Sequence, residues 1–300
     1  MKKGFTLVEL LVVIGILGIL AAVLVGAFSG GADSARAIKC MSNMKSLASA
    51  CQTYGMARGH YPLAGSVEKV ELDESHGYQN VKMKYYELAG WLSWDSRGAY
   101  RGSVNSHIAS VGWYTSTYSA DMAEREFAYT NGVLWRYLSG NRNVYLCPDH
   151  VRKYKDSTPP AWSYFMNSYF GWDSSRGTAA KSETFFGIYY DSLKRADRRL
   201  LFAEMPFMDR GVTVDPDGSA GTEFDCVLQY ADDSEAETIG FNHSSSKRSH
   251  FAHVVFADGH AEKLTWPKEG LEPSKIKDLT KWLCQGKDVS FDGKVYREMK

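Results

Sequence analysis

The feature that most constrains this chain is an apolar segment, Phe5 to Phe28, that contains a single charged residue, Glu9. About 20 apolar residues are enough for a helix to cross the hydrocarbon core of a bilayer, so we expect a transmembrane helix over residues 5–28. A secretory signal peptide has a shorter apolar region of about 7–15 residues. A carboxylate inside an apolar helix is costly and usually functional, so an ordinary membrane anchor does not account for Glu9.

A cleavage between Gly4 and Phe5 gives Glu9 a partner. Phe5 would then carry a free amine four residues before Glu9, which is about one turn of a helix. The amine can neutralise Glu9 within one helix, or it can pair with Glu9 of a neighbouring subunit when helices bundle. A buried charge favours whichever arrangement supplies its partner. The acid therefore predicts an assembly role.

The residues around this bond, Lys3-Gly4 followed by Phe-Thr-Leu-Val-Glu-Leu-Leu-Val-Val-Ile, resemble the processing site of type IV prepilins and type II secretion pseudopilins. The resemblance implies that prepilin peptidase cuts after Gly4 and methylates the amine of Phe5, and that Glu9 docks the subunit into a filament. It implies a single-pass protein of the inner membrane with a cytoplasmic N-terminus and a periplasmic or extracellular C-terminal domain. The expected partners are the peptidase, other pilin or pseudopilin subunits, and the inner membrane.

This interpretation divides the chain into a leader (1–4), a transmembrane helix (5–28), an amphipathic continuation of that helix (29–55) and a globular domain (56–300). Ser29-Gly30-Gly31 would become a joint within one long helix. Beyond it, apolar side chains recur at helical spacing, which fits either this continuation or a separate surface helix: Ile38, Met41, Met44, Leu47, Cys51 and Tyr54.

The later part of the chain predicts strands and loops. Short segments rich in β-branched and aromatic residues predict strands at 143–147, 162–167, 184–190 and 199–205. A helix followed by strands indicates an α+β fold. The resemblance to pilins makes this a long N-terminal helix packed on an antiparallel β-sheet with large loop insertions.

Segments across the later chain also resemble a large pilin-like family, common in planctomycetes, that has a C-terminal His…Asp-Gly signature. In this chain Arg248 occupies the histidine position of that signature. The resemblance is carried by VYLCPDH (144–150), SYFMNSYFG (163–171), RRLLFAEMPF (198–207) and HVVFADGH (253–260).

Asp258-Gly259, between two apolar-alternating runs, predicts a hairpin with a two-residue type I′ turn. Such a turn would pair His253 with Leu264 and place His253, His260 and Glu262 on one sheet face. The three side chains are metal-ligand types, but polar members of a strand face are the preferred interpretation, and we assign no metal.

Composition and motifs exclude several classes of function. With 35 basic and 35 acidic residues the chain has no net charge to attract nucleic acid. It has no Gly-x-Ser-x-Gly elbow, phosphate loop or dinucleotide motif, so we expect a structural protein rather than an enzyme, without a cofactor. Calcium at Asp215-Pro216-Asp217-Gly218 with Glu223 is an alternative to a solvated turn.

The alternative function is a membrane-tethered surface protein that recognises glycans or exported proteins through aromatic loops. Exposure of four tryptophans along one groove would favour this role: Trp91, Trp94, Trp113 and Trp172.

Overall fold

The computed structural model describes residues 7–64, 90–92, 129–130, 132–153, 162–171, 188–206, 226–228, 230, 238–246, 249–267, 272–294 and 296–299. For residues 21–30, 245–246, 267 and 273 the description covers the backbone only.

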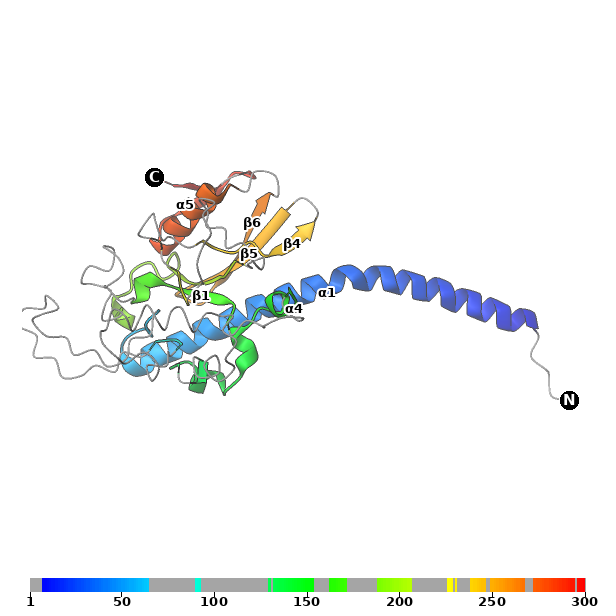
Figure 1. The fold of residues 1–300 in the computed structure, drawn as a ribbon, viewed down its shortest axis with the longest axis horizontal. Coiled ribbons are helices and arrows are strands. Elements are labelled where there is room, and N and C mark those ends of the chain that lie inside the picture. Colours follow the sequence, from blue (N-terminus) through cyan, green and yellow to red (C-terminus); the bar gives the residue numbers. More distant parts are fainter. Residues whose placement is uncertain are drawn as a thin grey trace, which may run out of the picture.

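One long helix, α1 (Leu7–Arg58), sets the shape of the molecule. Its N-terminal half projects away from the rest of the chain, and its C-terminal half is embedded in the domain that the later residues form (Figure 1). The backbone stays helical through Ser29-Gly30-Gly31. Glycine lowers helix propensity by only about 1 kcal/mol per residue, which the helical turns on both sides outweigh. The predicted N-terminal helix is confirmed as one continuous element.

The embedded half of α1 buries an apolar stripe at spacings of four and three residues: Cys40, Met44, Leu47, Cys51 and Tyr54. The predicted stripe is wrong at its start, because Ile38 is 70% exposed and the buried face there is formed by Ala37 and Cys40. Small residues at this point let the helix approach the domain closely.

The sheet against which α1 packs has six strands in the order β3-β1-β2-β5-β4, with β6 also paired to β5. Only β1 and β3 run parallel among the described strands, so the sheet is mixed rather than wholly antiparallel. The α+β class is confirmed. The strands are β1 (Tyr164–Asn167), β2 (Leu200–Glu204), β3 (Val227–Leu228), β4 (His243–Ser246), β5 (Ser249–Phe256) and β6 (Ala261–Pro267).

Strand β5 has two differently occupied edges. Strand β6 covers one edge along most of its length. The other edge is shared, because β2 pairs with β5 from Val254 to Phe256 while β4 pairs with it from Ser249 to Phe251. The ladder on that edge is therefore interrupted at Ala252 and His253.

Two of the four predicted strands, 162–167 and 199–205, are confirmed as β1 and β2. The prediction for 143–147 is wrong: a 3-10 helix forms there, initiated by the Asn141 side chain, which accepts a hydrogen bond from the Asn143 N–H. In the fourth segment only Ile188 to Tyr190 are described, and they form an isolated bridge at Tyr189 and the start of a 3-10 helix.

The remaining elements are short. They are the 3-10 helices η2 (Trp135–Leu138), η3 (Arg142–Tyr145), η4 (Ser168–Phe170) and η7 (Tyr190–Ser192), the helices α4 (Pro148–Lys153) and α5 (Pro273–Cys284), and the hairpin strands β7 (Val289–Phe291) and β8 (Tyr296–Glu298). Among them, η2, η3 and α4 pack against α1.

The Asp258-Gly259 hairpin exists, but its predicted type and register are wrong. The Phe256 carbonyl accepts from the Gly259 N–H, and the Phe256 N–H donates to the His260 carbonyl. Within this turn Gly259 has a positive φ, +90°, and Asp258 does not. This is a type I turn followed by a left-handed glycine. The extra loop residue shifts the register by one, so His253 lies opposite Lys263.

Candidate functional site

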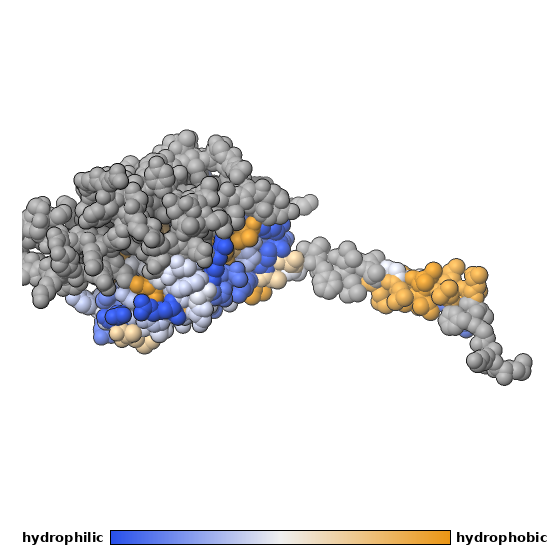
Figure 2. Space-filling view, turned by 60° about the horizontal axis from the view of Figure 1, so that its bottom comes forward, coloured by the Kyte–Doolittle hydropathy of each residue, from blue (hydrophilic) through white to orange (hydrophobic). Residues whose placement is uncertain are grey.

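The projecting half of α1 is the first candidate site. Every residue from Leu7 to Leu20 is exposed, including Leu7 at 78% and Ile19 at 67%. In the view of Figure 2 these apolar side chains form a continuous hydrophobic patch along the projecting helix. Glu9 lies in the first turn, among them. An apolar surface of this size marks a contact with lipid or with other protein.

Several predicted features of this segment fall outside the described residues. Gly4 and Phe5 precede the described chain, and the predicted span over 5–28 is described in part only. Within the residues that are described, no helical stretch combines the length and hydropathy that a membrane crossing requires.

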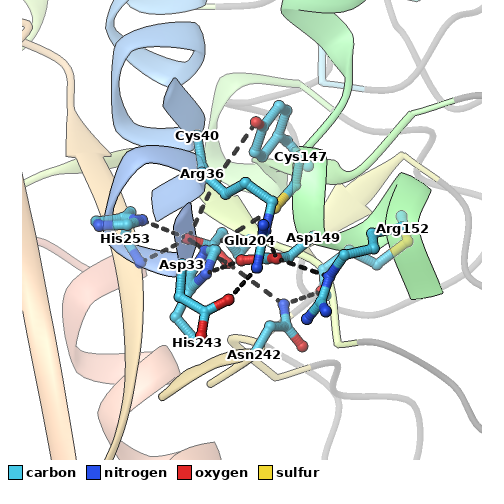
Figure 3. A network of polar contacts seen from close by, with 12 residues as sticks. Asp33, Arg36, Cys40, Cys147, Asp149, Arg152, Glu204, Asn242, His243 and His253 are labelled. Atoms are coloured by element: carbon cyan, nitrogen blue, oxygen red, sulfur yellow. Dashed lines mark hydrogen bonds and ion pairs between the residues drawn. The ribbon is translucent and has the colours of Figure 1, made fainter. Parts of the chain in front are cut away.

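The second candidate site is a buried polar cluster between α1 and the sheet (Figure 3). Its centre is Glu204, the last residue of β2, which is completely buried. His253 Nδ1 lies 2.8 Å from Glu204 Oε1, and His243 Nε2 lies 3.1 Å from the same oxygen. Cys40 Sγ, on α1, is 3.4 Å from it. Four segments far apart in the sequence thus meet at one carboxylate.

The interrupted edge of β5 explains why a carboxylate is buried there. The backbone N–H of His253 faces the gap between β2 and β4, and it donates to Glu204 Oε1 over 2.9 Å. A buried N–H without a partner would cost about as much as a lost hydrogen bond. Glu204 therefore completes the sheet at the point where the ladder is broken.

A second acid, Asp149 of α4, holds the cluster from the side. Its Oδ2 lies 2.9 Å from Nδ1 of His243, and its Oδ1 lies 2.5 Å from Nε of Arg36. Arg36 also contacts Asp33 one turn earlier on α1. His243 is thus clamped between two carboxylates, one on each ring nitrogen.

The charges of these groups depend on one another. Burial by itself raises the pKa of the Glu204 carboxyl, but His243 and His253 outweigh it and bring that pKa to about 2. Burial lowers the pKa of His243, but Glu204 and Asp149 raise it to about 12. Near neutral pH the cluster therefore contains a buried ion pair between Glu204 and His243.

Two thiols border the ion pair. Burial raises the pKa of Cys40. Burial also opposes ionisation of Cys147, but hydrogen bonds from Cys40 and His243 lower its pKa to about 7. Cys147 Sγ lies 3.8 Å from His243 Nε2. All five cysteines are free thiols in this structure.

The structure does not bring together the three predicted metal-ligand candidates. His253 is 2% exposed and belongs to the buried cluster. Glu262 is exposed and His260 is partly exposed at the hairpin, where His260 Nδ1 lies 2.6 Å from Asp258 Oδ1. The one-residue register shift moves Glu262 to the sheet face opposite that of His253.

Other predicted sites are only partly within the described residues. Trp91 is fully buried and donates its Nε1–H to the Cys226 carbonyl, so it does not contribute to an exposed groove. Trp94, Trp113 and Trp172 lie outside the described residues, as does the candidate calcium loop at 215–223.

Cys40, Glu204 and His243 were not predicted as site residues. One sequence signal could have found them: Glu204 is a charged residue within the otherwise apolar run LLFAEM, which predicts a buried strand. A buried acid requires partners. Nothing in the spacing of the four residues along the chain indicates which ones they are.

The N-terminal segment is similar to segments of known proteins. Residues 1–25 match the family model of the prokaryotic N-terminal methylation motif. Type II secretion system core protein G of Pectobacterium carotovorum subsp. carotovorum is 41% identical over 61 residues, which cover 20% of this chain and 39% of that protein. Its namesake from Klebsiella michiganensis is 41% identical over 61 residues, which cover 43% of its length.

The match thus covers about two fifths of the length of these curated relatives. No solved structure matches the chain. The chain carries the prepilin-type methylation motif, which confirms its resemblance to type IV pilin-like and type II secretion pseudopilin proteins over the N-terminal segment.

Proposed function

We propose that the chain is a structural subunit of a type II secretion pseudopilus or a related type IV pilus-like filament. Prepilin peptidase cuts after Gly4 and methylates the amine of Phe5. The helix that begins at Phe5 anchors the subunit in the inner membrane with a cytoplasmic N-terminus, and the domain after residue 56 lies on the periplasmic or extracellular side. The role involves no catalytic step.

The observation that carries this proposal is the contrast between the two halves of α1. The half that begins near Arg36 is packed into the domain, whereas residues 7–20 are exposed and apolar. Burying one large apolar side chain yields about 1.5–3 kcal/mol. The projecting half bears many such side chains: Leu7, Val8, Leu10, Leu11, Val12, Val13, Ile14, Ile16, Leu17, Ile19 and Leu20. A bilayer or a bundle of equivalent helices supplies the burial that the domain does not.

Glu9 sets the register of such a bundle. A carboxylate near the centre of a membrane helix costs about 2.5–3.5 kcal/mol, and less near an end. Pairing with the amine of Phe5, in the same helix or in a neighbouring subunit, removes most of this cost. When the amine belongs to the neighbouring subunit, a shift of the helix along that neighbour by one or two residues would lose the pair and restore the cost, so the pair between subunits is the one that sets register.

Processing and assembly are tested separately in cells that contain the cognate peptidase and assembly machinery. Gly4→Leu should leave an uncut chain with four extra residues, because the peptidase site requires a small residue there. Glu9→Ala should still be cut, but it should be depleted from the filament fraction relative to membranes. Asp33→Asn is the matched control, since Asp33 is an acid on α1 beyond the apolar segment.

Native filament levels of a cleaved Glu9→Ala chain would contradict the pairing argument. Normal cleavage of Gly4→Leu would contradict the processing argument.

A further inference from the structure

The buried cluster offers four donor atoms of the types that bind zinc. They are Cys40 Sγ, Glu204 Oε1, His243 Nε2 and His253 Nδ1. A sulfur, a carboxylate oxygen and two imidazole nitrogens form a ligand set typical of a tetrahedral zinc site. We propose that these four side chains bind one divalent cation of the zinc class, between α1 and the sheet.

The geometry supports this assignment. The four atoms all lie within 4.8 Å of one another, and all four residues are buried. Metal–ligand distances of about 2.0–2.3 Å place tetrahedral ligands roughly 3.3–3.7 Å apart. The Cys40–Glu204 distance is 3.4 Å, whereas the two Glu204–histidine distances are 2.8 and 3.1 Å. Binding therefore requires the His253 ring to move away from Glu204 by at least roughly 0.5 Å and the His243 ring by at least roughly 0.2 Å, which rotation of the rings achieves.

The surrounding groups are placed as supports for metal ligands. Nδ1 of His243 faces Asp149, which leaves Nε2 directed at the proposed cation. Metal-bound histidines almost always donate their other ring N–H to a carboxylate, a backbone carbonyl or a water, and Asp149 supplies such a partner. Asn242 Nδ2 lies 3.4 Å from Glu204 Oε2, the oxygen that is not required as a ligand. The Tyr164 hydroxyl donates to Cys40 Sγ over 3.4 Å, which stabilises a thiolate.

The charges also fit a divalent cation. A Cys40 thiolate and the Glu204 carboxylate together carry two negative charges, which balance the cation, and both histidines bind it in their neutral form. Binding releases the thiol proton of Cys40 and the extra proton of His243 to solvent. The bound site is then neutral overall, apart from the Asp149–Arg36 pair beside it.

The consequence is a clamp between the projecting helix and its domain. Cys40 comes from α1, whereas Glu204, His243 and His253 come from β2, β4 and β5. One cation would thus link the helix to three strands, just inside the domain and close to the point where α1 leaves it. A ligand that binds only the folded state stabilises that state.

Cobalt(II) titration of the full-length chain in detergent, after removal of metal by a chelator, tests the proposal. We expect one equivalent to bind, with a thiolate-to-cobalt absorption band in the near ultraviolet and strong visible bands of tetrahedral cobalt. Zinc should displace the cobalt. Cys40→Ser should lose the thiolate band, whereas Cys51→Ser, a buried cysteine on the same helix, should keep it.

Asp149 is a positioning residue in this scheme, so Asp149→Asn should weaken cobalt binding by about 10–100-fold without moving the thiolate band. His253→Gln should weaken binding and also change the visible bands, because a ligand is lost. Circular dichroism checks that each variant is folded.

X-ray absorption of the zinc-loaded native chain needs no variant. It should show one sulfur at about 2.3 Å and three lighter ligands at about 2.0–2.1 Å. Absence of saturable cobalt binding to the folded chain would overturn the proposal. A zinc shell without sulfur would also overturn it, as would a thiolate band that survives in Cys40→Ser. None of these results depends on cleavage at Gly4.

Discussion

The buried side chain of His150 makes the stability of the domain depend on pH. The side chain lies in α4 and is completely buried, and its Nδ1 is 2.9 Å from the Ser163 hydroxyl. Burial lowers the pKa of His150 to about 3, with a further contribution from Lys153. In the unfolded chain the pKa of histidine is about 6.5.

The sign of the effect follows from proton binding. Between pH 6.5 and 3 the unfolded chain binds a proton at this position and the folded chain does not. Stability from the neutral ring is therefore fully present above about pH 6.5 and is lost as the pH falls. Between pH 7 and pH 5 the loss is about 2 kcal/mol. For a domain of this size that corresponds to a fall in Tm of roughly 4–8 °C.

The perturbation is His150→Asn, because the asparagine amide can still bond Ser163 and does not titrate. Between pH 7 and pH 5 we expect the Tm of the variant to fall by less than the Tm of the native protein, the difference being roughly 4–8 °C. The Tm is followed by near-ultraviolet circular dichroism in detergent with a chelator. His260→Asn, at a partly exposed histidine, controls for the loss of an imidazole. An unchanged pH slope in His150→Asn would refute the reasoning, as would an NMR titration of His150 near pH 6.5.

Three further predictions concern folding and are measured by urea unfolding. Leu47→Ala should lower stability by about 2–5 kcal/mol, because Leu47 lies on the face of α1 that packs into the domain and is fully buried; a loss below 1 kcal/mol would contradict that packing. Asn167→Leu should lower the free energy of unfolding by about 2–4 kcal/mol, since the Asn167 amide donates to the carbonyls of Leu200 and Cys284. An unchanged free energy of unfolding would contradict the importance of these two hydrogen bonds. Gly259→Ala should cost about 1–2 kcal/mol, because φ is +90° and a Cβ would lie 3.0 Å from Gln52 Nε2; equal stability would contradict the turn geometry.

The sequence predicts the elements whose signals are local. The apolar run from Phe5 and the spaced stripe at Met44, Leu47 and Cys51 indicate a long helix without any knowledge of the sheet. Apolar strands such as 199–205 are likewise visible, because they are buried on both faces.

Features that depend on tertiary contacts could not be predicted in the same way. An Asp-Gly pair suits both a two-residue and a three-residue hairpin loop. Here the Asp258 carboxylate accepts the His260 N–H, which fits the longer loop. That single extra residue determines which side chains share a face with His253.

The buried cluster depends on contacts at still longer range. Glu204 is recognisable as an unusual acid in an apolar strand, but its partners come from a helix more than 160 residues earlier and from two strands that follow. Only the broken edge of β5 brings His243 and His253 to the same carboxylate.

The proposed function requires a processed subunit whose helix starts at Phe5. Mass spectrometry of the N-terminal peptide, from the protein extracted out of native membranes, tests it most directly. We expect a mature chain that begins with N-methylated Phe5. A mature chain that begins at Met1, or one trimmed beyond Phe28, would contradict it.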